Sequence, residues 1–379
     1  ADTEEAEIWY KNLVSRFKDN LEPKYLFKYA QVLRSNGKYK KSDSIFLSMN
    51  SSDKSNRQEE LKKENYLLDY SIDEDMRIGV RNLAINTEYS DFGGFLLNGK
   101  TYFTSAIPSG DKRQKLYKWN NQPFLNIYKA DEEIQTLEES IKDTVLTVHK
   151  PRLIDNPISS EYHESTPVFT KDGKTIYFTR NNYNGKKVGR DKKNTSNLKI
   201  YKASFVNGYW LNVKELPFNG DDFSVGHPAL SPDEKTLYFV SNMPGGYGAT
   251  DIYKVAIKGK NEYGTPINLG ETINTSDKEM FPFVGDDNTL YFSSNGHLGL
   301  GLLDIFQSKV KEDGTFSPVK NLGDPFNSKR DDFSFYINED GKKGFFSSNR
   351  KKGKGDDDIY SFYIYTDPII CTQSVSGVI

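Results

Sequence analysis

Five acidic residues recur at one place in a repeated pattern and are the first candidates for chemistry. Each stands a few residues before a strand-like apolar stretch: Glu88, Glu164, Asp222, Glu279 and Asp332. If these stretches surround a channel, the five carboxylates form an acidic ring at its mouth, which would attract a cation or a basic peptide segment. The alternative is that each carboxylate caps backbone amides of its own turn or is solvated. Four asparagines near these turns favour the alternative, because Asn at a turn usually satisfies its own loop. They are Asn86, Asn219, Asn274 and Asn327.

A second acidic set, Asp251, Asp304 and Asp358, recurs together with Ser-Asn pairs and indicates hydrogen bonds inside each repeat. The acidic run at 356–358 and the turn at 285–287 lack the alternate-position ligand spacing of a calcium loop. The histidines also show no ligand spacing. They are His149, His163, His227 and His297. We therefore predict no metal ion and no cofactor.

Catalytic motifs are weak in this chain. Neither a Gly-x-Ser-x-Gly elbow nor a phosphate-binding glycine-rich loop occurs. The stretch from Lys171 to Phe178 resembles the Asp-box of sialidases, but that box is a structural turn, and the arginine triad and tyrosine nucleophile of those enzymes cannot be assigned here. The prediction is a non-enzymatic protein.

The elements that would position these residues follow from an internal repeat. An aromatic doublet comes after each of five turn-forming clusters: Tyr102-Phe103, Tyr177-Phe178, Tyr238-Phe239, Tyr291-Phe292 and Phe345-Phe346. An Ile-Tyr or Ile-Phe pair then follows each doublet, beginning at Ile127, Ile200, Ile252, Ile305 and Ile359. Five copies with a period of roughly 40 to 75 residues are typical of propeller blades. We expect the doublet on the second strand of each blade, counted from the inside, and the Ile pair on the third.

The ring should close by strand exchange. The stretch from Arg77 to Leu83 matches segments that elsewhere end a blade, at 266–270 and 319–323, so an outermost strand comes first in the chain. It would pair, at about Val80 to Ile85, with the strand from Asp358 to Ile364, giving five blades of four strands, twenty in all, and no open edge. An insertion from Glu132 to Thr144 has helical spacing, and a basic loop runs from Lys186 to Lys193. Both are expected on the surface.

The first 69 residues are expected to be helical. The spacing of apolar residues from Tyr29 to Phe46, broken at Asn36-Gly37, matches a tetratricopeptide hairpin. A stretch from Ala6 to Arg16 is similar to the second helix of a preceding repeat, and a third helix is expected from Asn56 to about Leu68. We predict a tetratricopeptide-like helical domain at 1–69, a five-bladed β-propeller at 70–366 and the start of a carboxypeptidase-regulatory-like β-sandwich at 367–379. The fold class is thus mainly β with an α-helical N-terminal part.

Charge and composition exclude some classes of partner. The 379 residues carry 51 basic and 53 acidic side chains, a net charge of -2, which gives no general attraction to nucleic acid or anionic lipid. No apolar run is long enough for a membrane-spanning helix. The single cysteine, Cys371, excludes an internal disulfide and a cysteine-based zinc site.

The repeat resembles a known family. The segments Ser231 to Phe239, Ser293 to Asn295 and Asp251 to Tyr253 resemble the WD-repeat-like propeller shared by TolB and a group of bacterial outer-membrane-associated proteins, over about Arg77 to Tyr365. In PorE-type components of the type IX secretion and gliding apparatus, helical repeats, such a propeller, a regulatory-like β-sandwich and a peptidoglycan-binding OmpA-like domain follow in this order. The resemblance implies a periplasmic, outer-membrane-associated scaffold. Its partners would be proteins of an outer-membrane or secretion complex, and peptidoglycan through a domain absent from this sequence. The competing hypothesis is a glycan-binding or glycan-active propeller that uses aromatic residues at the channel mouth.

Overall fold

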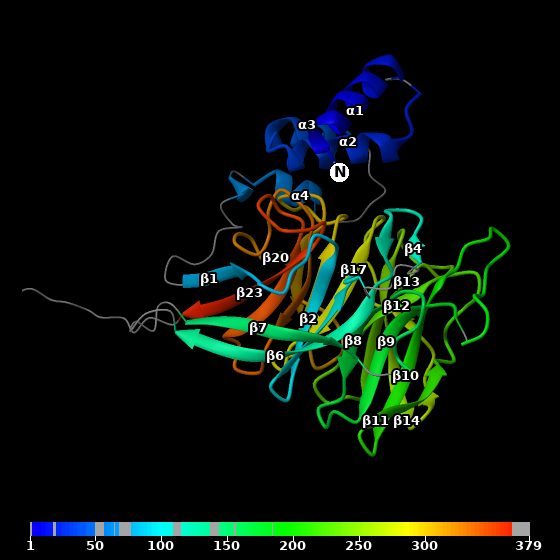
Figure 1. The fold of residues 1–379 in the computed structure, drawn as a ribbon. Coiled ribbons are helices and arrows are strands. Elements are labelled where there is room, and N and C mark those ends of the chain that lie inside the picture. Colours follow the sequence, from blue (N-terminus) through cyan, green and yellow to red (C-terminus); the bar gives the residue numbers. More distant parts are fainter. Residues whose placement is uncertain are drawn as a thin grey trace, which may run out of the picture.

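The computed structural model shows a five-bladed β-propeller with a few helices at its N-terminal end (Figure 1). It describes residues 2–17, 20–49, 57–63, 65–67, 77–108, 115–136, 144–154, 157–183 and 185–365. The predicted domain limits near residues 69 and 366, and the segment 367–379, lie outside the described residues. The fold class predicted from the repeat is confirmed.

Each blade is an antiparallel sheet whose first strand lies nearest the central axis. Blade 1 consists of β2 (Asp91–Leu97), β3 (Lys100–Ser105), β6 (Asn126–Thr136) and β7 (Thr144–Leu153). Blade 2 consists of β8 (Glu164–Phe169), β9 (Thr175–Asn181), β10 (Leu198–Val206) and β11 (Tyr209–Glu215). Blade 3 consists of β12 (Val225–Leu230), β13 (Thr236–Ser241), β14 (Asp251–Gly259), β15 (Glu262–Tyr263) and β16 (Ile267–Asn268). Blade 4 consists of β17 (Glu279–Val284), β18 (Thr289–Ser294), β19 (Asp304–Lys309) and β20 (Lys320–Asn321).

Blade 5 closes the ring with strands from both ends of the repeat. It consists of β21 (Asp332–Ile337), β22 (Lys343–Ser348), β23 (Asp358–Tyr365) and β1 (Arg77–Asn82). Strand β1 pairs antiparallel with β23, with Val80 opposite Phe362. The predicted exchange is confirmed, although β1 begins three residues before the expected start. Beyond the predicted twenty strands, the described residues contain a small hairpin of β4 (Leu116–Tyr117) and β5 (Gln122–Pro123), and blade 3 divides its outer strand into two short pieces.

The core lies between the blades and is built from the repeated residues. The second aromatic of each doublet is buried on the second strand: Phe103, Phe178, Phe239, Phe292 and Phe346. The repeated isoleucine is buried on the third strand: Ile127, Ile200, Ile252, Ile305 and Ile359. Because alternate side chains of a strand point to opposite faces, each doublet contributes to both sides of its blade.

Two expected helices differ from the structure. The insertion predicted as a helix from Glu132 to Thr144 instead lengthens β6 and β7, with Ile134 opposite Leu146; residues 137–143 lie outside the described ones. The paired strand satisfies the backbone groups here, and three apolar positions at helical spacing were too weak a signal against it. The third helix, α4 (Arg57–Leu61), ends well before Leu68. The basic loop at Lys186 to Lys193 lies between β9 and β10 as a loop.

The N-terminal helices are α1 (Thr3–Phe17), α2 (Pro23–Ser35) and α3 (Tyr39–Ser48). Helices α2 and α3 form the expected hairpin, broken at Gly37, whose φ of 72° lies in the left-handed region. Buried Ser42 donates its hydroxyl to the carbonyl of Ala30 at 2.8 Å, so the position where tetratricopeptides usually carry alanine binds the facing helix. Membership of the tetratricopeptide family stays a prediction.

Candidate functional site: the loop faces of the propeller

The five acidic residues predicted as a ring do not occupy equivalent positions. Glu164, Glu279 and Asp332 are fully buried first residues of innermost strands. The first residue of the innermost strand is Asp91 in blade 1 and Val225 in blade 3. Exposed Glu88 and Asp222 each lie three residues earlier, in the loops that lead into these strands. The structure therefore brings together no five-carboxylate ring at these positions.

The buried carboxylates hold the turns that precede them. Each accepts hydrogen bonds from the backbone amide and the hydroxyl of a Ser or Thr four residues earlier. At Glu279 these bonds come from Thr275, at 2.8 Å and 2.7 Å. The other pairs are Thr87 with Asp91, Ser160 with Glu164, and Ser328 with Asp332. Among the described residues no group of three or more His, Cys, Asp or Glu side chains could hold a metal ion.

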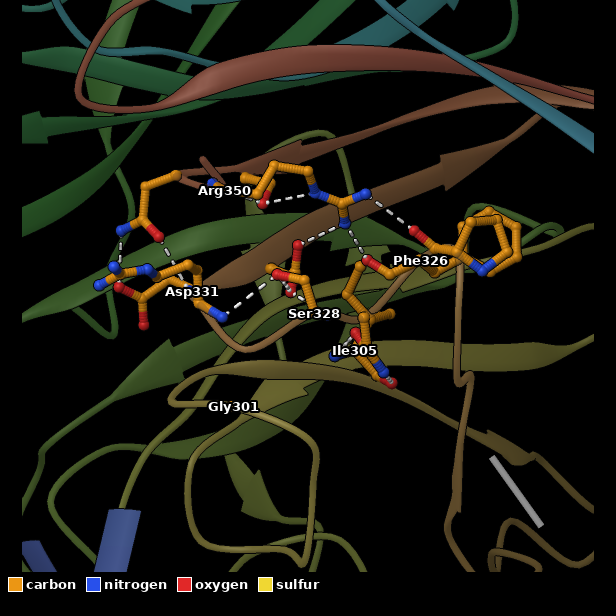
Figure 2. A network of polar contacts seen from close by, with 12 residues as sticks. Gly301, Ile305, Phe326, Ser328, Asp331 and Arg350 are labelled. Atoms are coloured by element: carbon orange, nitrogen blue, oxygen red, sulfur yellow. Dashed lines mark hydrogen bonds and ion pairs between the residues drawn. The ribbon is translucent and has the colours of Figure 1, made fainter. Parts of the chain in front are cut away.

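Two of these carboxylates also pair with an arginine, of which Arg180 is buried and Arg350 is partly buried. Arg350 donates to Asp332 at 2.7 Å and to the carbonyl oxygens of Pro325 and Phe326, and Figure 2 shows its guanidinium pointing into this turn beside Ser328. Arg180 makes the corresponding 2.8 Å ion pair with Glu164. The arginines are therefore occupied inside the blades.

Glu279 differs from these two carboxylates because its described donors are hydroxyls and an amide, as they are at Asp91. Ser294 donates to Glu279 at 2.7 Å in addition to Thr275. Burial raises the pKa of Glu279 to about 8, the largest of the effects on this group. A protonated carboxyl can donate to either hydroxyl oxygen, so the site accommodates the neutral acid.

The second acidic set closes the loops that lead into the third strands. Asp358 accepts hydrogen bonds from the amide of Gly355 at 3.1 Å and from the side chain of Asn82 at 2.9 Å. A Gly-x-Gly-x-x-Asp order recurs here: Gly246, Gly248 and Asp251; Gly299, Gly301 and Asp304; Gly353, Gly355 and Asp358. The glycines are needed because a Cβ on Gly353 would lie 2.2 Å from the Asp358 carboxylate, and one on Gly355 would lie 2.0 Å from the carbonyl oxygen of Tyr89. These glycine pairs are not among the residues predicted above, although their spacing is visible in the sequence.

The four asparagines bind strands rather than their own loops, which corrects the sequence interpretation. Asn274 accepts from the amide of Ile252 at 2.8 Å and donates to its carbonyl at 3.0 Å. The same two-bond clamp joins Asn86 to Ile359, Asn219 to Ile200 and Asn327 to Ile305. An amide side chain matches the spacing of one residue's N–H and C=O, so the clamp replaces a missing strand partner.

A small cavity lies on the central axis, between the described innermost strands. The third residue of every innermost strand has a left-handed φ, and these residues are Gly93, Thr166, His227, Phe281 and Ser334. Phe281 packs against His227 with ring centres 4.1 Å apart, and the cavity between the strands measures about 60 Å³. That volume accommodates about two water molecules. Burial lowers the pKa of His227 to about 4, so this histidine is neutral at pH 7.

Acidic residues do converge on the axis at the opposite mouth, in the turns between first and second strands. Lys171 of blade 2 reaches Asp286 of blade 4 at 2.9 Å. This hydrogen bond, with the nearby charges of Glu339 and Glu234, raises the pKa of Lys171. The lysine therefore neutralises part of this acidic cluster from within the chain.

The helices dock on the loop of blade 4 that joins β18 to β19 (Figure 1). Buried Arg34 of α2 donates to the carbonyl of Gly299 at 2.7 Å, to Asp43 at 2.7 Å and to the hydroxyl of Tyr66 at 2.9 Å. Leu298 of the same loop is buried in the apolar cluster of the helices. The helices and the propeller are thus joined by packing and by buried hydrogen bonds.

A groove of about 1170 Å³ opens between blades 4 and 5. Strand β20 has only two residues, so the outer part of blade 4 does not cover the facing sheet of blade 5. The apolar floor includes Ile78, Leu322, Ile337 and Ile364. Acidic residues lie at both ends: Glu59 and Glu60, beside Lys63, at one, and Asp286, Asp287, Glu339 and Asp340 at the other.

Aromatic side chains gather beside the β4–β5 hairpin. The ring of Tyr117 lies 4.6 Å from His163, and Phe124 packs against both His163 and Tyr162. Trp119, between the two strands of the hairpin, is 88% exposed. Here the hairpin presents flat rings over blades 1 and 2.

Comparison with known proteins adds a likeness to solved propeller structures. No family model and no curated protein matches the chain. A putative TolB from Agrobacterium tumefaciens is 13% identical, with 78% of this chain and 99% of that one covered and a TM-score of 0.40. An α-L-arabinofuranosidase from Lactobacillus brevis is 15% identical over 74% and 92% of the two chains, with a TM-score of 0.44. The family 117 glycoside hydrolase Zg3597 from Zobellia galactanivorans is 14% identical over 80% and 96%, with a TM-score of 0.42. Within the described residues, no helix has the length and apolarity needed to cross a membrane.

Proposed function

We propose that the chain is a non-enzymatic, protein-binding scaffold of the periplasm, associated with an outer-membrane complex such as the type IX secretion apparatus. The groove between blades 4 and 5 is the observation that carries the proposal. The periplasmic location proposed for the protein is suggested by the resemblance of the repeat to outer-membrane-associated propellers. The polar residues of the blades support the absence of catalysis, because the buried acids and arginines are engaged in turns and loops.

The groove fits an extended segment of a partner protein. Its floor is apolar and is formed by strands of two blades, while both ends are acidic. An extended peptide with apolar side chains in the middle and Lys or Arg at its ends would match this pattern. Such an arrangement gives orientation through charge and affinity through buried apolar area.

Site-specific photo-crosslinking tests this proposal in cells. A benzophenone amino acid replaces Lys320, an exposed residue on the rim of the groove, and as a matched control Lys214, an exposed residue on the outer strand of blade 2. We expect outer-membrane or secretion proteins to be captured from position 320 and not from 214. The combined change Glu339→Lys and Asp340→Lys should reduce that capture, because it reverses the charge of one end. Capture of no such protein from position 320 would reject the proposal.

A second candidate function, glycan binding, is favoured by the exposed rings at the β4–β5 hairpin. Flat aromatic faces stack on sugar rings, and Trp119 presents its indole to solvent. Glycan-array binding of the chain is compared with that of Trp119→Ala and of a control, Tyr209→Ala, which removes another exposed ring (66%) from blade 2. Binding that disappears only in Trp119→Ala supports this function, and a chain that binds no glycan excludes it.

A further inference from the structure

Helix α1 has one broad apolar face that runs from Trp9 through Leu13 and Phe17 to Tyr10. One edge of this face packs on α2 through Tyr10, whose ring stacks on Tyr29 at 6.5 Å. On the rest of the face, Trp9 and Phe17 are 71% and 55% exposed. Helix α1 begins beside the propeller, where Arg330 donates a hydrogen bond to the hydroxyl of Thr3 at 3.2 Å, and its label in Figure 1 lies above that of α2. An apolar helix face that is only partly covered usually packs against a further element.

The exposed part of this face forms one wall of a groove. Leu21 and Tyr25, at the start of α2, form its second wall, and its volume is about 750 Å³. Helices α1, α2 and α3 follow one another as antiparallel neighbours, with α2 between the other two. A helix in this groove would extend the same stack, so the surface continues an interface that the chain already uses.

Two charges beside the groove, Glu5 and Arg16, are complementary to the same two residues of an identical helix turned round, while Asp2 and Glu22 add negative charge to the lining. Glu5 in the first turn and Arg16 in the last turn lie about three helical turns apart and therefore on the same rim of the apolar stripe. In an antiparallel pair of identical helices, matching rims face each other, so Glu5 of one copy lies opposite Arg16 of the second copy and Trp9 lies near its Leu13. Each contact occurs twice by symmetry.

We propose that α1 is a dimerisation helix and that the occupant of this groove is α1 of a second copy of the chain, packed antiparallel. The contact is about 22 Å long for a helix of this size, which places it among small interfaces. The dimer is accordingly reversible and depends on protein concentration. This proposal does not rest on the partner groove between blades 4 and 5, which lies on a different part of the chain.

Sedimentation equilibrium at about 1 to 100 µM tests the self-association over the range expected of a small interface. We expect a monomer–dimer equilibrium for the unmodified chain and, for Trp9→Ala, a dissociation constant raised about 30-fold, because an aromatic residue at the centre of a small interface dominates it. Trp119→Ala is the control, since it removes another exposed indole (88%, against 71% for Trp9) from the β4–β5 hairpin, and it should leave the constant unchanged. An unmodified chain that is monomeric throughout overturns the proposal, as does equal dimerisation of the Trp9→Ala variant.

A charge exchange tests the antiparallel arrangement separately. Glu5→Arg and Arg16→Glu should each raise the dissociation constant about 3- to 10-fold, because each places like charges opposite one another twice. The double variant restores the opposite charges and should return the constant to within about 3-fold of the original. Circular dichroism checks that the helices are intact in each variant. A double variant no better than the single ones overturns the antiparallel pairing.

Discussion

At the scale of single residues, buried Glu279 should make the stability of the propeller fall as the pH rises. Its pKa is about 8 in the folded chain, against 4.5 for an ordinary glutamate. Below pH 4.5 both states hold the proton, and its contribution to the free energy of unfolding is fully present. Between pH 4.5 and 8 the unfolded state releases the proton while the folded state keeps it, so the contribution is lost as the pH rises through this range. We expect a loss on the order of 2–4 kcal/mol, from a pKa difference of this direction and size.

Urea denaturation at several pH values checks this prediction with Glu279→Gln as the comparison. The amide is neutral at every pH and of similar shape, so the decline in the free energy of unfolding should be smaller in the variant. Other buried acids, such as Glu164, also make the free energy of unfolding depend on pH, and they do so equally in both proteins. Parallel pH profiles for the variant and the unmodified chain would show that Glu279 is ionised in the fold.

The repeated glycines give a second prediction at this scale. In Gly355→Ala the new Cβ would lie 2.0 Å from the carbonyl oxygen of Tyr89, in the loop of the next blade. Rigid backbone has to move, and we expect a loss of about 2–4 kcal/mol in the free energy of unfolding. Gly264→Ala is the control, because its Cβ would have no neighbour closer than 3.5 Å. It should be neutral or slightly stabilising. Equal thermal stability of the two variants would contradict this account of the Gly-x-Gly loop.

At the scale of elements, Arg34 should decide whether the helices stay docked. Arg34→Met keeps most of the side-chain volume but leaves Asp43 without its 2.7 Å ion pair and the carbonyl of Gly299 without its donor. Removing one partner of a buried pair costs about 3–5 kcal/mol. Hydrogen exchange should rise in α2 and α3 while β18 and β19 keep their protection.

The control for this change is Lys24→Ala, which removes an exposed ion pair with Glu22 on the same helix. Exposed pairs contribute about 0–1 kcal/mol, so exchange in α2 should hardly change. Exchange that rises equally in both variants, or that rises across the whole propeller in Arg34→Met, would mean that Arg34 does not act at the junction.

The elements with a repeated pattern were predictable, and those without one were not. Turn residues, the aromatic doublet and the Ile pair recur in all five copies and predict the same strands each time. A chance spacing in one copy therefore does not change the predicted fold. The insertion beginning at Glu132 occurs once, and there the local helical spacing lost to pairing between β6 and β7. A unique segment offers only its own propensity, which tertiary pairing readily overrides.

At the scale of the whole molecule, ring closure follows from counting strands, but the direction of side chains does not. The five acids were predicted to lie at one mouth because each precedes an innermost strand. Glu88 and Asp222, however, lie three residues before the first residue of their strands, where the other acids stand. Loop length varies between copies, and a sequence does not show which acid is turned inward. The cluster around Lys171 joins the turns of blades 2 to 5 around the axis, with Lys171 of blade 2 bound to Asp286 of blade 4, and the partners of such a contact are visible only in the folded ring.

Strand exchange itself leads to the last prediction, that a covalent link between β1 and β23 stabilises the entire ring. Ile78 lies opposite Ile364. The amide of Ile364 donates to Lys342 on the other side, so the two residues form a non-hydrogen-bonded pair with close Cβ atoms. A disulfide in Ile78→Cys/Ile364→Cys/Cys371→Ser closes a loop around all five blades. We expect the free energy of unfolding of the oxidised form to be about 2–4 kcal/mol higher than that of the reduced form. Thermal unfolding with and without reductant measures this difference, and Ile78→Cys/Cys371→Ser, which has no cysteine partner, should show none. If oxidation leaves the triple variant unchanged, β1 does not hold the ring closed, because a strand that frays independently would transmit no constraint to the other blades.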